Sequence, residues 1–208
     1  SGNNGSGKTT FSSNLALTIA KNTGKKVLLI DLDTVGANIN NFFNVNKINK
    51  DISIKIDEDK VCVLNYFTEA IQKNIFDYDM FLSLVIRYGK CNNLHIITGN
   101  TSMFVCQNVL CEEYYSKILE KAKELYDYIV IDTNSSLFLD ATKWALENAD
   151  VIYYILEGSY KDIVNLKNNL GIFSKSWDIL LDKIEIILNK NNNYSLSKDY
   201  IQSVFNLK

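Results

Sequence analysis

Residues 2–9 read Gly2-Asn3-Asn4-Gly5-Ser6-Gly7-Lys8-Thr9, which matches the pattern G-x-x-x-x-G-K-[ST] at every fixed position. The glycines allow a tight turn whose backbone N–H groups converge on an anion at the start of the next helix. The lysine adds a positive charge, and the threonine hydroxyl can ligate Mg²⁺. Because a helical pattern follows at once, the stretch predicts a loop that binds nucleotide phosphates rather than a simple glycine-rich turn.

Short apolar runs alternate with longer helical patterns along the rest of the chain. The apolar runs are continuous and rich in Ile and Val, which is typical of strands buried on both faces; they cover residues 27–30, 94–97, 128–131, 151–156 and 184–188. The helical patterns cover residues 9–21, 112–125, 137–148 and 163–173, with two more helices expected within residues 61–88. This alternation predicts an α/β fold, a three-layer sandwich around a mostly parallel sheet, and we expect one domain over residues 1–208.

The position of the loop at the start of the sequence is unusual. Such a loop hangs from the end of a buried strand, whereas only Ser1 precedes it. We therefore expect the first strand of the domain to be missing, and the last residues to form the helix before a further strand.

Composition narrows the function classes. The chain has 208 residues, 47% of them hydrophobic, and a net charge of -2, which is ordinary for a globular protein. It shows no polybasic tract for nucleic acid or anionic lipid, and no apolar run near the ~20 residues that span a bilayer. The four cysteines form no C-x-x-C pair, and the single histidine, His95, lies in an apolar strand pattern. We therefore expect no zinc site and a structural role for His95.

Polar side chains directly follow several of the expected strands. Asp31, Asp132 and Asn189 each come right after an apolar run, and Asp33 lies two residues beyond Asp31. Because open parallel sheets bind ligands beyond the carboxyl ends of their strands, we expect these side chains at the same edge as the loop. Asp132 can hold Mg²⁺ there, directly or through a water. Of Asp31 and Asp33, one can orient an attacking water and the other support the metal or the loop. A turn or helix-cap role is the alternative for each carboxylate alone.

The order of these motifs resembles the ParA/MinD ATPases over nearly the whole chain, and most closely the branch that includes pilus-assembly ATPases of the CpaE/TadZ type. The motifs that carry the resemblance are residues 2–10, 27–33, 126–133, 149–150 and 187–190. The resemblance implies a P-loop NTPase fold that uses ATP and Mg²⁺. It implies that Asp33 positions the hydrolytic water with Asp31 as its companion, that Asp132 is the Walker B carboxylate, that Asn189 contacts the adenine, and that residues 157–159 lie near the base.

The predicted site residues fall into three groups. The catalytic group is Lys8, Asp33 and Asp31. The nucleotide-binding group is Gly5, Ser6, Gly7, Lys8, Thr9, Thr10 and Asn189. The Mg²⁺ ligands are Thr9, Asp132 and Asp33.

Two departures from the family pattern matter for the chemistry. Asn3 occupies the position of a second lysine that reaches the phosphates of a dimer partner in ParA and MinD. An amide cannot supply that charge to a phosphoryl transition state, so we expect an ATP hydrolase with slow turnover. Asn134 and Ser135 stand where many members have two prolines, which predicts a less rigid segment after Asp132.

Three functions fit these residues. The leading hypothesis is an Mg-ATP switch that positions or recruits a machine for partition, septum placement, or pilus or secretion assembly. It would have an ATP-dependent homodimer and a protein partner, and would be cytoplasmic or peripheral to the inner membrane through partners. The alternatives are a phosphotransferase similar to bacterial tyrosine kinases and an ATP-binding module with little hydrolysis. A GTPase is disfavoured because Asn192 stands where a guanine motif that begins at Asn189-Lys190 requires Asp.

Overall fold

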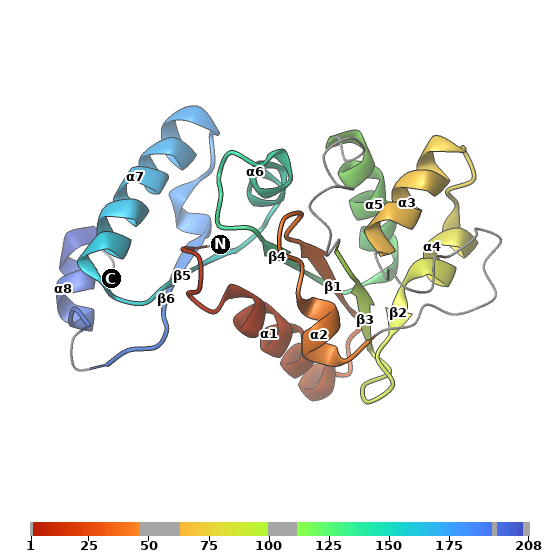
Figure 1. Cartoon of the computed structure of the whole chain (residues 1–208), viewed down its shortest axis with the longest axis horizontal. Helices are drawn as coiled ribbons and strands as arrows, with labels where there is room; N and C mark the ends of the chain where they lie inside the picture. The colour runs from red at the N-terminus through yellow and green to blue at the C-terminus, as the bar shows by residue number, and fades with distance from the viewer. Residues whose placement is uncertain (1, 46–62, 100–111, 193–194, 206–208) are drawn as a thin grey trace. The chain divides into compact units, whose positions relative to one another are not determined.

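A computed structural model describes residues 2–45, 63–99, 112–192 and 195–205 (Figure 1). The chain packs into two compact units. The terminal unit comprises Ser1–Lys8 and Lys143–Lys208, and the central unit comprises Thr9–Thr142. One domain over residues 1–208 stays a prediction.

A four-stranded sheet forms the middle of the central unit. Its order is β2 (Ile86–Arg87), β3 (Leu94–Ile97), β1 (Val27–Leu32) and β4 (Tyr128–Thr133). Strand β1 is parallel to both β3 and β4, whereas β2 is antiparallel to β3. All six residues of β1 are buried, as expected for a central strand covered on both faces. The register places Asp31 directly opposite Asp132, so two carboxylates lie side by side at the end of the sheet.

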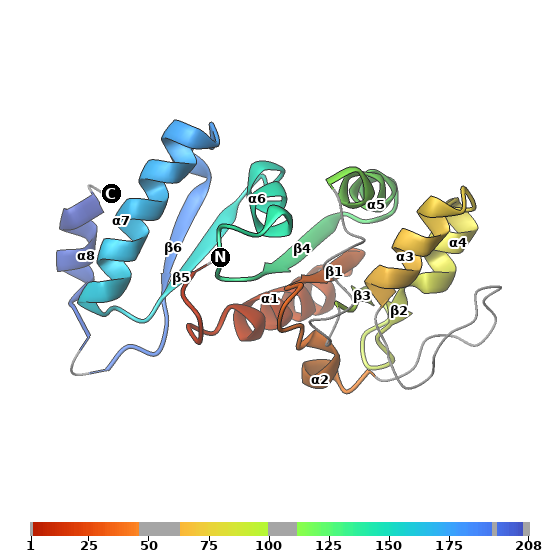
Figure 2. The same ribbon diagram turned by 45° about the horizontal axis from the view of Figure 1, so that its top comes forward.

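Helices cover this sheet on both faces. Figure 2 shows α1 (Lys8–Thr23) on one side of the sheet and α5 (Glu112–Leu125) on the other. Helix α3 (Val63–Gln72) contacts both α5 and α4 (Tyr78–Leu84). The short α2 (Ile39–Phe43) follows the loop after β1. The apolar face of α5 explains its position, because its inward side chains are buried while its acidic and basic residues stay outside.

The terminal unit contains a two-stranded parallel sheet, β5 (Ile152–Leu156) with β6 (Ile184–Leu188). Its other elements are most of α6 (Asp140–Glu147), then α7 (Tyr160–Ser176), the 3₁₀ helix η1 (Leu181–Lys183) and α8 (Lys198–Phe205). Gly2 forms an isolated parallel bridge to Ile155, which places the start of the phosphate loop beside β5. Helix α7 begins with a capping box in which Ser159 and Asp162 satisfy each other's backbone N–H groups.

The α/β fold with a mostly parallel sheet confirms the sequence prediction. All five predicted strands are present within two residues of their expected ends. Two helices do lie in the middle region, although residues 61–62 fall outside the described residues. Helix α7 starts before the predicted residue 163 because the capping box sets its first turn, and α6 is shorter than residues 137–148. Strand β2 and helix α2 were not predicted, since two and five residues give no readable periodicity.

None of the helices in the described part of the chain combines the length and the apolar character that crossing a bilayer requires. His95 lies on β3, where its Nδ1 is 2.7 Å from the hydroxyl of Tyr126. Burial lowers the pKa of His95.

Candidate functional site

At two glycines of the phosphate loop, Gly2 and Gly7, the neighbouring atoms leave no room for a side chain. A Cβ on Gly2 would lie 2.2 Å from the carbonyl oxygen of Ile155, and a Cβ on Gly7 would lie 2.4 Å from Nδ2 of Asn189. Both glycines also have positive φ angles, 133° and 95°. These are values that L side chains rarely adopt. The neighbours of the loop therefore fix its backbone.

Inside the loop, the carbonyl oxygen of Asn3 accepts two hydrogen bonds. The Ser6 N–H donates to it over 3.3 Å, and Nζ of Lys8 donates over 3.0 Å. The hydroxyl of Ser6 is fully buried and has no hydrogen-bond partner among the described residues. A buried hydroxyl without a partner, an ammonium group and a turn of N–H groups form a donor set that fits a polyphosphate.

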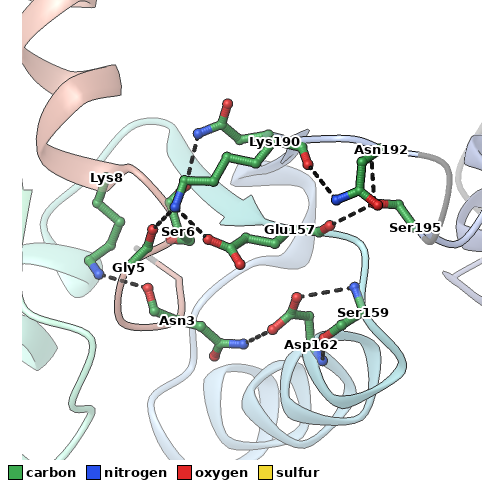
Figure 3. Close-up of polar contacts among 11 residues, drawn as sticks. Asn3, Gly5, Ser6, Lys8, Glu157, Ser159, Asp162, Lys190, Asn192 and Ser195 are labelled. Atoms are coloured by element: carbon green, nitrogen blue, oxygen red, sulfur yellow. Dashed lines mark hydrogen bonds and ion pairs between the residues drawn. The ribbon is translucent and has the colours of Figure 1, made fainter.

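Side chains that follow β6 hold the outside of the loop (Figure 3). Nδ2 of Asn189 donates to the Ser6 carbonyl over 2.9 Å. Nζ of Lys190 donates to the Gly5 carbonyl over 2.5 Å and forms an ion pair with Oε1 of Glu157 over 2.8 Å. The predicted residue Asn189 thus reaches the loop. Glu157 was expected near the base, whereas Lys190 was not predicted as a site residue.

Asn3 is built into a network with helix α7 (Figure 3). Its Nδ2 donates to Oδ1 of Asp162, and its Oδ1 accepts a longer bond of 3.4 Å from Nδ2 of Asn165. Asp162 is only 7% exposed and also accepts the Ser159 N–H. The Asn3 amide therefore ties the loop to the first turns of α7.

In the central unit, the first turn of α1 meets the end of β4. The hydroxyl of Thr9 donates to Oδ2 of Asp132 over 2.5 Å. Hard oxygen donors of this kind suit Mg²⁺, which keeps several waters and takes few protein ligands. The next residue, Thr133, has a buried hydroxyl with no hydrogen-bond partner in the described structure. No group of three or more His, Cys, Asp or Glu that could hold a metal occurs among the described residues.

Asp31 holds the segment that follows β1. Its Oδ1 accepts the Asp33 N–H over 3.2 Å, and its Oδ2 accepts the Asn38 and Ile39 N–H groups over 2.9 and 3.0 Å. Burial raises the pKa of Asp31 from 3.8 to about 7, and the charge of Asp132 adds to this, while the N–H donors act in the opposite direction. The side chain is only 1% exposed. These contacts favour a role for Asp31 in shaping the segment that follows β1, residues 33–39.

The pKa of Asp31 gives a prediction for stability against pH. Because it is higher in the folded state than its usual 3.8, the folded protein binds more protons than the unfolded chain between pH 4 and pH 7. The free energy of unfolding should therefore fall as pH rises through this window, on the order of a few kcal/mol. Urea unfolding at several pH values measures this slope. The slope should shrink in Asp31→Asn, and an unchanged slope would assign it to other groups.

Asp33 presents one occupied and one open oxygen. Its Oδ1 accepts the Val35 and Gly36 N–H groups over 3.1 and 2.8 Å, and Nδ2 of Asn134 over 2.7 Å. Its Oδ2 has no hydrogen-bond partner among the described residues. The carboxylate is therefore fixed at one oxygen and free to accept from a ligand or a water at the other.

The segment after Asp132 is organised by side chains. Oδ1 of Asn134 accepts the Ser136 N–H over 2.8 Å, and Oγ of Ser136 accepts the Phe138 N–H over 3.3 Å. Such turns take the place of the prolines expected from the family pattern. They end at Phe138, whose side chain is 98% exposed. Whether the segment is less rigid than a proline-containing one stays a prediction.

The predicted site residues divide between the two units. The terminal unit holds Gly5, Ser6, Gly7, Lys8 and Asn189, and the central unit holds Thr9, Thr10, Asp31, Asp33 and Asp132. Thr10 is exposed on the first turn of α1. Two of the unpredicted residues had a signal in the sequence, since Lys190 follows Asn189 and Asn134 stands where the resemblance predicts a proline. For Asp162, the pattern Ser159-x-x-Asp162 before an apolar run indicates a capping box, but its contact with Asn3 depends on the fold.

Comparisons with known proteins identify the family and the fold. A family model, AAA_31, described as an AAA domain, matches residues 2–160. No match was found among curated proteins. A ParA family ATPase from Chlorobium tepidum has a TM-score of 0.78 at 19% identity, covering 97% of this chain and 76% of that one. The septum site-determining protein MinD from Pyrococcus horikoshii, complexed with Mg-ADP, has a TM-score of 0.70 at 19% identity, with 98% and 74% covered.

Two further solved structures extend the comparison. A plasmid partition protein from Borrelia burgdorferi has a TM-score of 0.71 at 25% identity, covering 99% of this chain and 83% of that one. The kinase domain of VpsO has a TM-score of 0.64 at 21% identity, with 91% and 81% covered. The family model spans well over half of the chain. The chain therefore belongs to the AAA_31 family of AAA domains and has the fold of the ParA/MinD P-loop ATPases.

Proposed function

We propose that the chain is an Mg-ATP-dependent ATPase switch that positions or recruits a cellular machine. The observation that carries the proposal is the contact of 2.5 Å between the Thr9 hydroxyl and Oδ2 of Asp132, immediately after a loop that ends in Lys8. A hydroxyl and a carboxylate next to a phosphate loop are what Mg-nucleotide binding requires. Membership of the family and the Mg-ADP complex of MinD support ATP and Mg²⁺ as the ligands.

Each side chain has a defined task in this proposal. The loop N–H groups and Lys8 bind the phosphates, while Thr9 and Asp132 hold Mg²⁺, which neutralises phosphate charge when bound. Oδ2 of Asp33, the open oxygen, orients the attacking water. Asp31 is a positioning residue, because its oxygens are engaged by the backbone that carries Asp33.

Slow hydrolysis is the second part of the proposal. The Asn3 amide is neutral and is engaged with Asp162 and Asn165. It therefore cannot deliver a positive charge to a developing phosphoryl transition state. This supports either an ATPase with low turnover or the more extreme case, an ATP-binding module with little hydrolysis.

We propose protein partnering as the output of the switch. The plasmid partition and septum site-determining proteins with this fold support a role in partition or positioning. An ATP-dependent homodimer and a protein partner from a positioning or pilus system complete the proposal. The proposed location is the cytoplasm, or the inner membrane surface where partners recruit the protein. The CpaE/TadZ-type pilus branch stays a prediction.

Phosphate release from ATP by the purified protein tests the proposal and separates the alternatives. We expect tight Mg-dependent ATP binding, weaker GTP binding and slow phosphate release that stops when Mg²⁺ is chelated. Binding without release would select the ATP-binding module. The fold shared with the VpsO kinase domain makes phosphotyrosine a necessary second readout, and its appearance would select the phosphotransferase. Failure to bind Mg-ATP would contradict all three.

A further inference from the structure

Lys190 contacts the phosphate loop from the outside (Figure 3). Asn189 and Lys190 are consecutive residues, and they donate to the consecutive carbonyl oxygens of Ser6 and Gly5 over 2.9 and 2.5 Å. Two successive peptide groups of the loop are thus held from the end of one strand. Asn189 was expected in contact with the base, whereas no role in the site was predicted for Lys190.

The backbone at Lys190 does not favour a lysine. Its φ angle is 53°, in the left-handed region, which glycine and asparagine adopt far more readily. Three asparagines follow directly at positions 191–193, so the segment is otherwise rich in residues suited to such a turn. The turn alone therefore does not account for a lysine here, but its contact with the loop does.

The ion pair with Glu157 orients Lys190 more than it stabilises the fold. The two side chains are 56% and 40% exposed, and exposed pairs contribute little to stability. Glu157 lies directly after β5, and its carbonyl oxygen accepts a hydrogen bond from Oγ of Ser195 over 3.3 Å. The partner that orients Lys190 is therefore itself held at the end of β5 by a hydrogen bond from Ser195.

The geometry of the peptide bond carries the effect to the phosphate side. No cis peptide occurs among the described residues, so each C=O points opposite to the N–H of the same peptide group. Holding the Gly5 carbonyl outward directs the Ser6 N–H inward, where it donates to the Asn3 carbonyl over 3.3 Å. Holding the Ser6 carbonyl likewise directs the Gly7 N–H away from Asn189.

We propose that Lys190, oriented by Glu157, is a positioning residue that holds the phosphate loop in its phosphate-receptive shape. This inference rests on the proposed function, and it deepens that function by naming what sets affinity for the phosphates. A residue that acts on the loop affects every ligand with a polyphosphate, whereas a residue that reads the base affects only nucleotides.

Calorimetry with Mg-ATP and with Mg-tripolyphosphate, which has no base, tests the inference. Lys190→Ala should weaken both ligands by the same factor, about tenfold, because one hydrogen bond from a charged donor is lost. Lys190→Arg should restore most of the affinity, since its guanidinium also donates to both acceptors. Glu157→Gln should have a smaller effect, since it removes only the partner that orients Lys190. Lys175→Ala, at an exposed position in the last turn of α7, is the matched control.

The outcomes separate the two proposals. If wild type binds both ligands and Lys190→Ala weakens only Mg-ATP, Lys190 reads the base and the inference is wrong. Unchanged affinity for both ligands also overturns the inference but leaves the proposed function intact. If wild type binds neither ligand, both proposals fail. A thermal melt of each variant checks that the fold is retained.

Discussion

Lys8→Ala is expected to abolish measurable binding of Mg-ATP. In the structure, Nζ of Lys8 lies 3.0 Å from the Asn3 carbonyl, inside the turn where the loop N–H groups gather. Phosphate oxygens are stronger acceptors than this carbonyl, because they carry charge. Losing the ammonium removes charge-assisted hydrogen bonds to two phosphate groups, of about 1.5–3 kcal/mol each, which corresponds to a loss in affinity of about 100-fold or more.

The same helix offers a matched control for this prediction. Lys21 lies in the last turn of α1, far along the helix from Lys8, and is exposed. Lys21→Ala should bind Mg-ATP as wild type does in the same calorimetric titration. Equal affinity in Lys8→Ala and Lys21→Ala would contradict the assignment of residues 2–9 as a phosphate loop.

Those parts of the fold were predictable that depend on patterns within a short stretch of sequence. The strand at Val27–Leu32 is a continuous apolar run, and a strand covered on both faces requires such a run. The first turn of α7 was missed because its start is set by a reciprocal pair of hydrogen bonds between Ser159 and Asp162. Periodicity does not reveal a capping box that precedes the first apolar residue.

For the candidate site, the sequence predicted which residue types are present, whereas their contacts became visible only in the structure. The sequence identified Asp31 as a carboxylate at a strand end, but only the path of the chain shows that three backbone N–H groups occupy it. Asn3 was recognised as a neutral residue, whereas its bond to Asp162 joins residues 159 positions apart. Lys190 reaches Gly5 across 185 positions, because β6 pairs with β5 and Gly2 bridges to the same strand. Contacts between residues so far apart in the sequence cannot be predicted from the spacing of sequence motifs.

Asp33→Asn is expected to reduce the rate of ATP hydrolysis by about 100-fold or more while ATP affinity stays within a few fold. An amide oxygen at Oδ1 can still accept the Val35 and Gly36 N–H groups, so the turn at residues 33–36 should keep its shape. What the variant loses is the charge at Oδ2, the oxygen open to a water. Single-turnover measurements of phosphate release suit this test, because we propose that hydrolysis is slow.

The control and the contrary outcomes decide between two roles of Asp33. Asp79→Asn, at an exposed position in the first turn of α4, should leave both binding and hydrolysis unchanged. If Asp33→Asn weakens Mg-ATP binding as much as it slows hydrolysis, the carboxylate serves the metal, which was its other predicted role. If hydrolysis is unchanged, another group orients the water. Asp31 cannot readily take that place, because its oxygens are buried and engaged by the backbone of the loop that presents Asp33.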